Sequence, residues 1–232
     1  MKKIYIVTLL FVFGFSVSHS QKDSVFVCDV KFKNSKFDNS HAGSGFLLKY
    51  NGKVYGITAK HVLFFAKTDR MKTISFGEDL VSWNFKSKNS DLSIKAGKLL
   101  NENPNEELKM PPKGDWLIFE IVGSVPKNAV VYSLRTEPLH KGDNVRFLGY
   151  PYNSKKLITI SGQYIGQTKD NNLRLDVPKG TYNGCSGGPV IDAKGNIVGI
   201  VSMGYFNKSE GKMIFEPASI EYFKQIIAQN QQ

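Results

Sequence analysis

The stretch Gly184–Pro189 reads Gly-Cys-Ser-Gly-Gly-Pro, and it is the most informative segment of this 232-residue chain. Glycines let a backbone turn tightly, so the N–H groups of Gly184 and Ser186 can converge on one point. Two such donors stabilise the oxyanion of an acyl-transfer reaction, each by about 3 kcal/mol. The same run also fits an ordinary hairpin turn, because Gly-rich punctuation with Pro usually marks turns. The segment therefore indicates either a nucleophilic Ser186 or a plain turn.

A serine nucleophile needs a histidine base near neutral pH, and the chain offers four histidines. His19 lies in the N-terminal apolar segment, while His41 and His140 lie in polar, loop-like stretches. His61 differs, because the apolar strand that begins at Val54 runs into a short turn that holds the imidazole at the rim of a core. His61 is therefore the candidate base, and a hydrogen-bonded core histidine is the alternative.

The base needs a carboxylate that orients it. Asp115 opens an apolar strand predicted over residues 115–121 and is the preferred acid. Asp91 is the minority choice, because Lys95 and Gly97 are expected to end its strand early. For either Asp, a strand-edge carboxylate that faces water is the simpler role. The chain order His, Asp, Ser favours the catalytic interpretation of all three together.

These motifs resemble those of trypsin-like serine peptidases, most closely the bacterial Deg-like members. Gly43–Leu47 resembles the Gly-Ser-Gly-Phe strand of the family, 58–63 its Thr-Ala-x-His-x-Leu segment, and Val145–Pro151 its second-barrel entry strand. The resemblance implies an all-β, chymotrypsin-like fold of two six-stranded antiparallel β-barrels. It also implies a C-terminal helix, packed on the second barrel and expected over residues 220–227, and no PDZ domain.

The resemblance also implies the roles of the site residues. Ser186 is the nucleophile, His61 takes its proton, Asp115 orients His61, and Gly184 and Ser186 form the oxyanion hole. Substrate backbone pairs with Ser202, Met203 and Gly204 as an extra strand. The primary pocket is lined by three segments, which include Thr181: residues 179–183, 202–204 and 214–216.

Specificity is only weakly indicated by the resemblance. Gly180 stands where trypsins carry a basic-selective Asp, so a Lys/Arg preference by that device is not expected. Thr181 suggests glutamyl specificity, but Val201 replaces the histidine that normally accompanies it. Glu216 either enters the pocket and favours a basic residue or is an exposed strand-end acid. Cys185 replaces the Asp that receives a new N-terminus in animal trypsins, so activity without that processing is expected.

The α/β-hydrolases are a competing enzyme class, because Gly184, Ser186 and Gly188 also fit their Gly-x-Ser-x-Gly pattern. Their triad runs Ser, then acid, then His, and no histidine follows Ser186 in this sequence. The segment before the serine is rich in short strand patterns and shows no βαβ alternation. An esterase of that class is therefore not expected.

Residues 1–20 have the pattern of a secretory signal, with Lys2 and Lys3, an apolar stretch over 4–17, and small residues at Ser18 and Ser20. The stretch is short for a membrane span, which needs about 20 apolar residues. We therefore expect an exported protein, periplasmic or secreted, without stable membrane insertion after signal cleavage. An uncleaved anchor is the alternative.

Composition adds a basic excess, with a formal net charge of +11. Nucleic acid is not an expected partner of an exported chain, whereas affinity for anionic surfaces or acidic substrates stays open. The two cysteines, Cys28 and Cys185, either form a disulfide or remain buried free thiols. No cluster has metal-ligand spacing, so neither a metal nor another cofactor is expected.

The predicted organisation is a signal peptide over 1–20, a first barrel over 21–123, a linker over 124–143 and a second barrel with the helix over 144–232. Residues 84–113 are expected to form surface loops. The leading hypothesis is an exported serine endopeptidase that cleaves protein or peptide substrates through an acyl-enzyme. The alternative is a catalytically silent peptide-binding or scaffold protein of the same fold.

Overall fold

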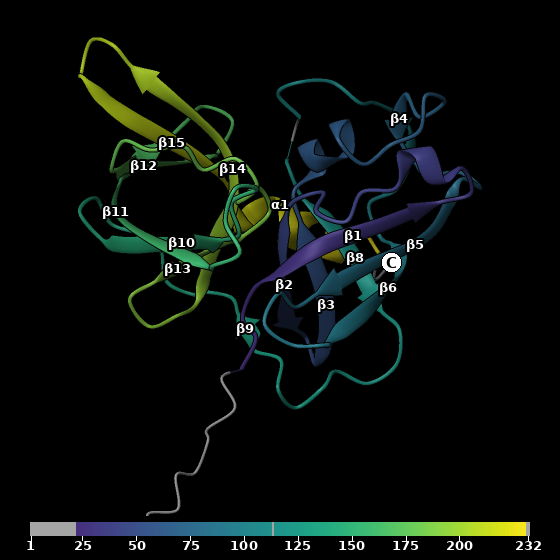
Figure 1. Cartoon of the computed structure of the whole chain (residues 1–232). Coiled ribbons are helices and arrows are strands. Elements are labelled where there is room, and N and C mark those ends of the chain that lie inside the picture. The colour runs from purple at the N-terminus through teal and green to yellow at the C-terminus, as the bar shows by residue number, and fades with distance from the viewer. Residues whose placement is uncertain (1–21, 113, 231–232) are drawn as a thin grey trace, which may run out of the picture.

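The computed structural model describes residues 22–112 and 114–230, which form two β-barrels side by side (Figure 1). The predicted signal peptide lies outside the described residues. The predicted fold class is confirmed, since both barrels are six-stranded and antiparallel. In the described part of the chain, one α-helix follows the second barrel.

The N-terminal barrel has the strand order β1-β5-β6-β8-β3-β2, and pairing of β1 with β2 closes it. Its six strands are β1 (Phe26–Phe32), β2 (Ser44–Tyr50), β3 (Lys53–Thr58), β5 (Leu80–Lys86), β6 (Ser93–Leu99) and β8 (Leu117–Ile121). A short strand, β9 (Val131–Ser133), adds to β2 in parallel. Two further strands, β4 (Thr73–Ile74) and β7 (Asn103–Glu107), form a small separate sheet.

The C-terminal barrel closes in the order β10-β11-β12-β15-β14-β13. Its strands are β10 (Asn144–Gly149), β11 (Ile158–Gln167), β12 (Leu173–Val177), β13 (Pro189–Asp192), β14 (Ile197–Asn207) and β15 (Lys212–Ser219). β12 shows why these segments are strands, because its buried residues alternate with half-buried ones. Such a period of two places one face of each strand in the barrel interior.

The expectation that residues 84–113 form surface loops was wrong for half of that segment. β5 continues to Lys86, and β6 is a full barrel strand that contains Lys95 and Gly97. The buried side chains of Ile94 and Ala96 alternate with polar neighbours, so the lysines of β6 face outward without interrupting the strand. The charged residues therefore suggested a loop wrongly, because one face of this strand is exposed to solvent.

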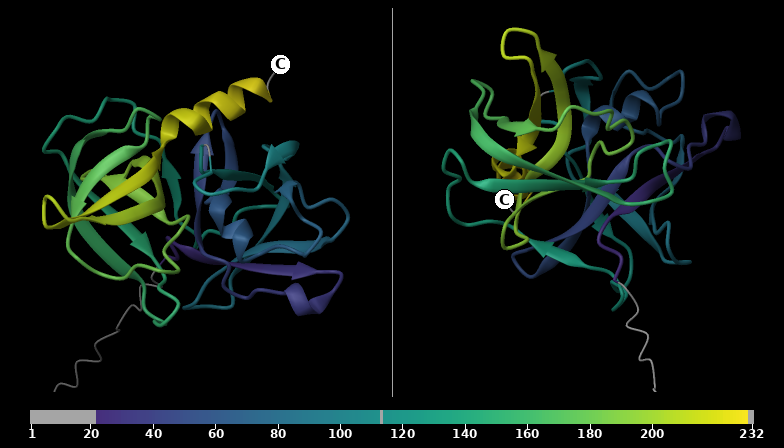
Figure 2. Two further views of the ribbon diagram at one scale, coloured as in Figure 1. Left: turned by 90° about the horizontal axis from the view of Figure 1, so that it is seen from above. Right: turned by 60° about the vertical axis from the view of Figure 1, so that its left-hand side comes forward.

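The helix α1 (Ile220–Gln229) crosses from the second barrel to the first (Figure 2). Its buried Phe223 packs against the rings of Tyr50, Tyr55 and Trp116, all in the N-terminal half. The expectation that the helix packs on the second barrel is therefore confirmed in part, because α1 contacts β14 and β15 of that barrel. Its apolar face also joins the core of the first barrel, so α1 ties the two barrels together.

Candidate active site

His61 and Asp115 lie together at the edge of the N-terminal barrel. His61 is in the 3-10 turn η2 (Lys60–Phe64), which follows β3, and Asp115 comes just before β8. The distance from His61 Nδ1 to Asp115 Oδ2 is 2.6 Å, and the His61 N–H donates to Asp115 Oδ1 at 2.8 Å. Both residues are buried, with 7% and 3% exposure. The carboxylate thus holds both the ring and the main chain of the histidine.

Ser202 on β14 donates a third hydrogen bond to Asp115 from its hydroxyl. An ionised carboxylate can only accept hydrogen bonds, so the proton between Asp115 and His61 belongs to Nδ1. Nε2 is then the unprotonated nitrogen of the neutral ring, available as a base. The sequence predicted Ser202 only as a contact to substrate backbone. Its bond to Asp115 could not be predicted, because no sequence pattern shows that β14 reaches this carboxylate.

The predicted nucleophile lies in a loop that presses against the N-terminal barrel. Gly187 has φ +83°, and a Cβ there would lie 2.6 Å from the Ala59 nitrogen and closer still to Thr58 Oγ1. The carbonyl of half-buried Ser186 accepts from the Ser44 N–H at 2.8 Å. The loop therefore meets the strand that leads to His61, and only glycine fits this approach. Within residues 22–112 and 114–230, no hydrogen bond joins Ser186 Oγ to His61 Nε2.

The backbone before Ser186 is turned so that two N–H groups are free. The Asn183 carbonyl accepts from the Tyr152 N–H at 3.0 Å. Because a trans peptide points its C=O and N–H in opposite directions, the Gly184 N–H faces away from Tyr152. Among the residues that the structure describes, neither the Gly184 nor the Ser186 N–H has a partner. The loop thus has two unused donors at the positions where the sequence predicted them.

Ser44 joins the two barrels behind this loop, a role that sequence analysis did not identify. It is fully buried, and its hydroxyl donates to the Gly184 carbonyl and accepts from the Tyr150 N–H, both at 2.9 Å. The Gly-Ser-Gly motif was noticed only as a resemblance. The sequence did contain one indication of this role. Ser44 is a polar residue at the start of an apolar strand, and a buried polar residue needs hydrogen-bond partners.

Lys60 supports the turn that carries His61. The side chain of Lys60 is completely buried, and its ammonium donates to Glu106 at 2.6 Å and lies against the ring of Tyr222. Glu106 belongs to β7 and Tyr222 to α1. The small sheet and the helix therefore both anchor η2 beside the His61–Asp115 pair.

The family profile described as trypsin-like peptidase domain matches residues 43–200, more than half of the chain. This chain belongs to the trypsin-like peptidase family. The matched segment contains the Gly-Ser-Gly strand, the His61 turn and the Ser186 loop. The sequence resemblance to trypsin-like serine peptidases is therefore confirmed.

Solved structures share the fold of this trypsin-like peptidase. The serine endoprotease from Yersinia pestis has a TM-score of 0.61 at 17% identity, and the match covers 91% of this chain and 64% of that one. An inactive form of Rv3671c from M. tuberculosis, with its serine mutated to alanine, has a TM-score of 0.54 at 16% identity, covering 90% of this chain and 86% of that one. This chain thus spans 64% of the Yersinia chain's length. Among curated proteins, none matches it.

Three aromatic rings cluster in the C-terminal barrel, and two of them, those of Tyr182 and Phe215, belong to segments predicted to line the primary pocket. Phe215 stacks on Phe147 with 5.0 Å between ring centroids, and the ring of Tyr182 meets both edge-on. A Cβ on Gly204 would lie 2.6 Å from the Phe215 ring, and one on Gly180 would lie 2.7 Å from Tyr182. The rings thus lie directly against Gly180 and Gly204, which also belong to the predicted pocket lining.

Other predicted residues lie apart from this aromatic cluster. Thr181 is exposed, and Met203 is half-buried beside exposed Gly204. Glu216 points to the opposite face of β15 from Phe215, where it meets Arg174 and the hydroxyl of Tyr205. It therefore does not enter the pocket from that position. Asp91, the alternative acid, is exposed in the turn between β5 and β6.

The two cysteines are free thiols, and both are buried. Burial raises the pKa of Cys28 and of Cys185 to about 12, so both stay protonated near neutral pH. Cys185 packs against Gly149, where it supports the loop before Ser186. In the described ranges, no group of three or more His, Cys, Asp or Glu side chains is arranged to hold a metal ion.

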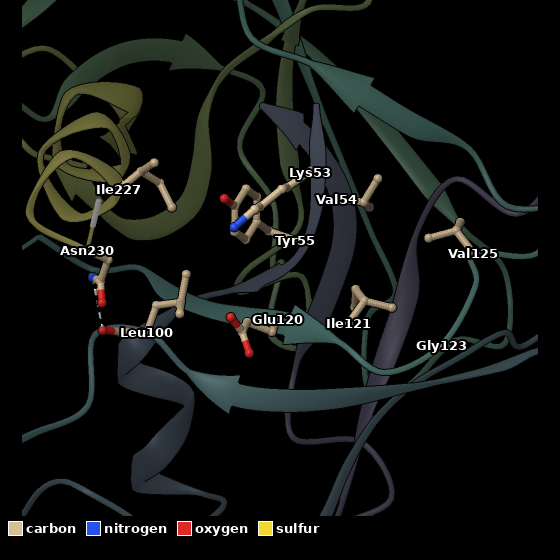
Figure 3. Close-up of a pocket in the computed structure, with 10 residues that line it drawn as sticks. All are labelled: Lys53, Val54, Tyr55, Leu100, Glu120, Ile121, Gly123, Val125, Ile227 and Asn230. Atoms are coloured by element: carbon tan, nitrogen blue, oxygen red, sulfur yellow. Dashed lines mark hydrogen bonds between the residues drawn. The ribbon is translucent and has the colours of Figure 1, made fainter. Parts of the chain in front are cut away.

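A cavity of about 440 Å³ lies between α1 and the N-terminal barrel (Figure 3). Lys53, Tyr55 and Glu120 provide its polar groups, and Leu100 and Ile227 are among its apolar ones. It contains none of the predicted site residues. This cavity is therefore separate from the His61–Asp115 pair.

Proposed function

We propose that this trypsin-like peptidase is an exported serine endopeptidase that cleaves proteins or peptides through an acyl-enzyme. Ser186 is the nucleophile, His61 the base and Asp115 the orienting acid, while the N–H groups of Gly184 and Ser186 bind the oxyanion. The observation that carries the proposal is the pair of hydrogen bonds between Asp115 and His61. One joins the carboxylate to the ring at 2.6 Å, and the other joins it to the main-chain N–H at 2.8 Å.

In the first half of the reaction, His61 Nε2 takes the proton of Ser186 as its Oγ attacks the scissile carbonyl. Asp115 stabilises the imidazolium that results and keeps the proton of Nδ1 in place. The negative charge on the carbonyl oxygen is met by the two free N–H groups of the loop. His61 then gives its proton to the leaving amine, and the peptide's acyl part stays on Ser186.

In the second half, water takes the place of the departed amine. His61 removes a proton from this water, which attacks the acyl-enzyme, and the same two donors stabilise the second oxyanion. The ester bond to Ser186 breaks, the serine regains its proton from His61, and the carboxylic product leaves. The resting state is thereby restored without a cofactor.

Substrate binding is assigned to Ser202, Met203 and Gly204 on β14, with Thr181 at the mouth of the pocket. The aromatic rings of Phe147, Tyr182 and Phe215 support a preference for a small side chain at the scissile residue, because they occupy the space beneath Gly204. A small side chain fits above the rings without displacing them.

Export is proposed from the N-terminal sequence pattern. Among the described residues, none of the helices is long and apolar enough to span a bilayer. Periplasmic and secreted locations both agree with the predicted signal segment. Detection of a mature protein that begins near Gln21 in an extracytoplasmic fraction tests this part of the proposal.

The silent peptide-binding protein is kept as a second candidate, because Ser186 Oγ makes no hydrogen bond to His61 in the described part of the chain. Catalytic hydrogen bonds are often long in the absence of substrate and tighten in the complex. The missing bond is therefore compatible with an active enzyme.

A fluorophosphonate probe separates the two candidates, since it reacts only with an activated serine. The probe is added to residues 21–232, to Ser186→Ala and to Ser93→Ala, a change of an exposed serine on β6 of the other barrel. One adduct by intact mass on the parent and on Ser93→Ala, with none on Ser186→Ala, supports the peptidase. No adduct on any of the three folded proteins supports the silent binding protein.

A further inference from the structure

The strand β14 has an unpaired edge beyond the candidate site. Its pairing with β13 ends at Ile200, whereas its pairing with β15 continues to the Asn207–Lys212 pair. Among the described residues, no strand pairs with the other edge of β14 from Ser202 to Asn207. The free edge is therefore twice as long as the three residues that the family resemblance assigns to substrate.

This part of β14 stands out from the barrel as one arm of a hairpin with β15 (Figure 1). Gly204, Tyr205 and Phe206 are exposed in succession, and the two aromatic side chains are 44% and 43% exposed. A free strand edge beside exposed aromatic rings is a template for pairing with another chain. Exposed apolar patches on protein surfaces mark sites of interaction with other molecules.

The free edge begins at the candidate catalytic residues. Ser202 touches Asp115, and Val201 exchanges hydrogen bonds of 2.8 Å with Gly187 and Gly188, directly after Ser186. A peptide whose scissile carbonyl lies at Ser186 can thus leave the site along β14. Its N-terminal part then points toward Asn207, so the peptide runs antiparallel to β14. Five residue steps at about 3.4 Å each give a track of about 17 Å.

We propose that the whole edge from Ser202 to Asn207 is a substrate track, which binds about six residues N-terminal to the scissile bond as an added strand. The inference rests on the proposed peptidase function and extends it. The track selects segments that are unfolded, since residues already paired in a native sheet have no free backbone groups to offer. Substrates with only three residues before the scissile bond leave its outer half empty.

The outer half of the track has two different faces. Phe206 lies on the same face as Gly204, under the ammonium of Lys179 at 5.2 Å from its ring centroid. Tyr205 lies on the opposite face, where its hydroxyl meets Glu216 at 3.3 Å. Both faces present aromatic carbon, so apolar side chains are favoured in the fourth to sixth substrate residues.

A length series of fluorogenic peptides tests the track. The scissile residue and everything after it stay constant. The number of residues N-terminal to the scissile bond, with the scissile residue included, grows from two to six. We expect kcat/KM to rise at least tenfold between three and six residues. Backbone N-methylation at residues four, five and six should remove the gain only at alternate positions, because alternate N–H groups of a strand face its partner. No gain beyond three residues, or loss without alternation, overturns the proposal.

Two substitutions localise the effect. In Phe206→Ser, the ratio of kcat/KM for six-residue and three-residue peptides should fall at least threefold. Val81→Ser is the matched control, because Val81 is 59% exposed on β5 of the other barrel, and its ratio should equal that of the parent. An equal loss in both variants contradicts the assignment. The N-methyl series uses the parent protein and decides the question even where a variant does not fold.

Binding separates failure of the track from failure of the peptidase function. Labelled peptides of three and six residues are titrated onto Ser186→Ala, and their Kd values are measured by fluorescence anisotropy. At least tenfold tighter binding of the longer peptide supports the track whether or not the parent cleaves. Equal Kd values in a parent that reacts with the fluorophosphonate overturn the track and leave the peptidase function standing.

Discussion

The two barrels hold their parts of the candidate site by different means. In the N-terminal barrel, a side chain holds the site, since the Asp115 carboxylate accepts hydrogen bonds from both the ring and the main chain of His61. In the C-terminal barrel, backbone does it, since the loop around Ser186 depends on positive φ values at Gly184 and Gly187. Substitutions should therefore disturb the first region through lost hydrogen bonds and the second through backbone strain.

The largest expected effect is in the side-chain region. Asp115→Asn should lower kcat/KM by about 10⁴, because the amide cannot keep the proton of His61 on Nδ1. Steady-state kinetics with a six-residue peptide measures the loss. Asp91→Asn is the control, since Asp91 is exposed, and it should retain full activity. A loss below tenfold in Asp115→Asn would show that this carboxylate does not orient the base.

A glycine substitution tests the backbone region. Gly187→Ala should lower the free energy of unfolding by about 4 kcal/mol, because the new Cβ combines left-handed strain with overpacking. Gly195→Ala is matched in φ, +85° against +83°, but its Cβ would meet nothing within 4 Å. It should cost about 1 kcal/mol, from strain alone. Urea denaturation compares the two, and equal losses would mean that contact with the other barrel contributes nothing.

The next effect concerns substrate specificity. The residues proposed to determine it, Gly204 and Phe215, lie in the C-terminal barrel. Phe215→Val should raise the preference for Phe over Ala at the scissile residue by about 10- to 100-fold, because it opens space beneath Gly204. Phe32→Val makes the same change at a buried site of the other barrel. That control should lower stability and leave the ratio of kcat/KM values unchanged. An unchanged ratio in Phe215→Val would place the pocket elsewhere.

Ser44→Ala tests the contact between the two regions. It should cost about 2 kcal/mol of stability, since the Gly184 carbonyl and the Tyr150 N–H both lose their partner in a buried place. It should also slow fluorophosphonate labelling, because the loop that carries the oxyanion donors loses support. Ser93→Ala, at an exposed serine, should change neither quantity. Normal labelling in a destabilised Ser44→Ala would show that the Ser44 contacts stabilise the fold but do not support the oxyanion loop.

A pH dependence from His41 has a similar expected size, but it is confined to acidic conditions. Burial, with the nearby Lys88 ammonium, lowers the pKa of His41 from 6.5 to about 4. Between these two pH values the unfolded chain binds a proton that the folded chain does not, so stability falls as the pH drops through this window. After allowance for partial exposure, the loss is about 2 kcal/mol.

The pH dependence is measured by urea unfolding between pH 7 and pH 4. In His41→Gln the contribution of this group disappears, so the difference in stability between parent and variant should shrink as the pH falls. His140→Gln is the control, because His140 is exposed and begins a turn in which its carbonyl accepts from the Asp143 N–H. A constant difference between the parent and His41→Gln across the window would contradict the assignment.

Most of the fold was predictable from the sequence, because its strands have clear local patterns. The strand predicted to begin at Val54 is β3, and the strand predicted over residues 115–121 contains β8. The helix was predicted over 220–227 and is α1. The full length of β6 was missed because its outward lysines resemble loop residues.

The roles of His61, Asp115 and Ser186 stay predictions, but their chemistry was readable in the sequence because each sits beside a distinct strand or glycine pattern. What the sequence by itself determined is therefore local: strand periods, turns and the residue types of a serine peptidase. Only the tertiary structure decided the contacts of Ser202 with Asp115, Ser44 with Gly184, and α1 with the first barrel. Those contacts join residues far apart in the chain, and their partners are set by barrel closure and packing.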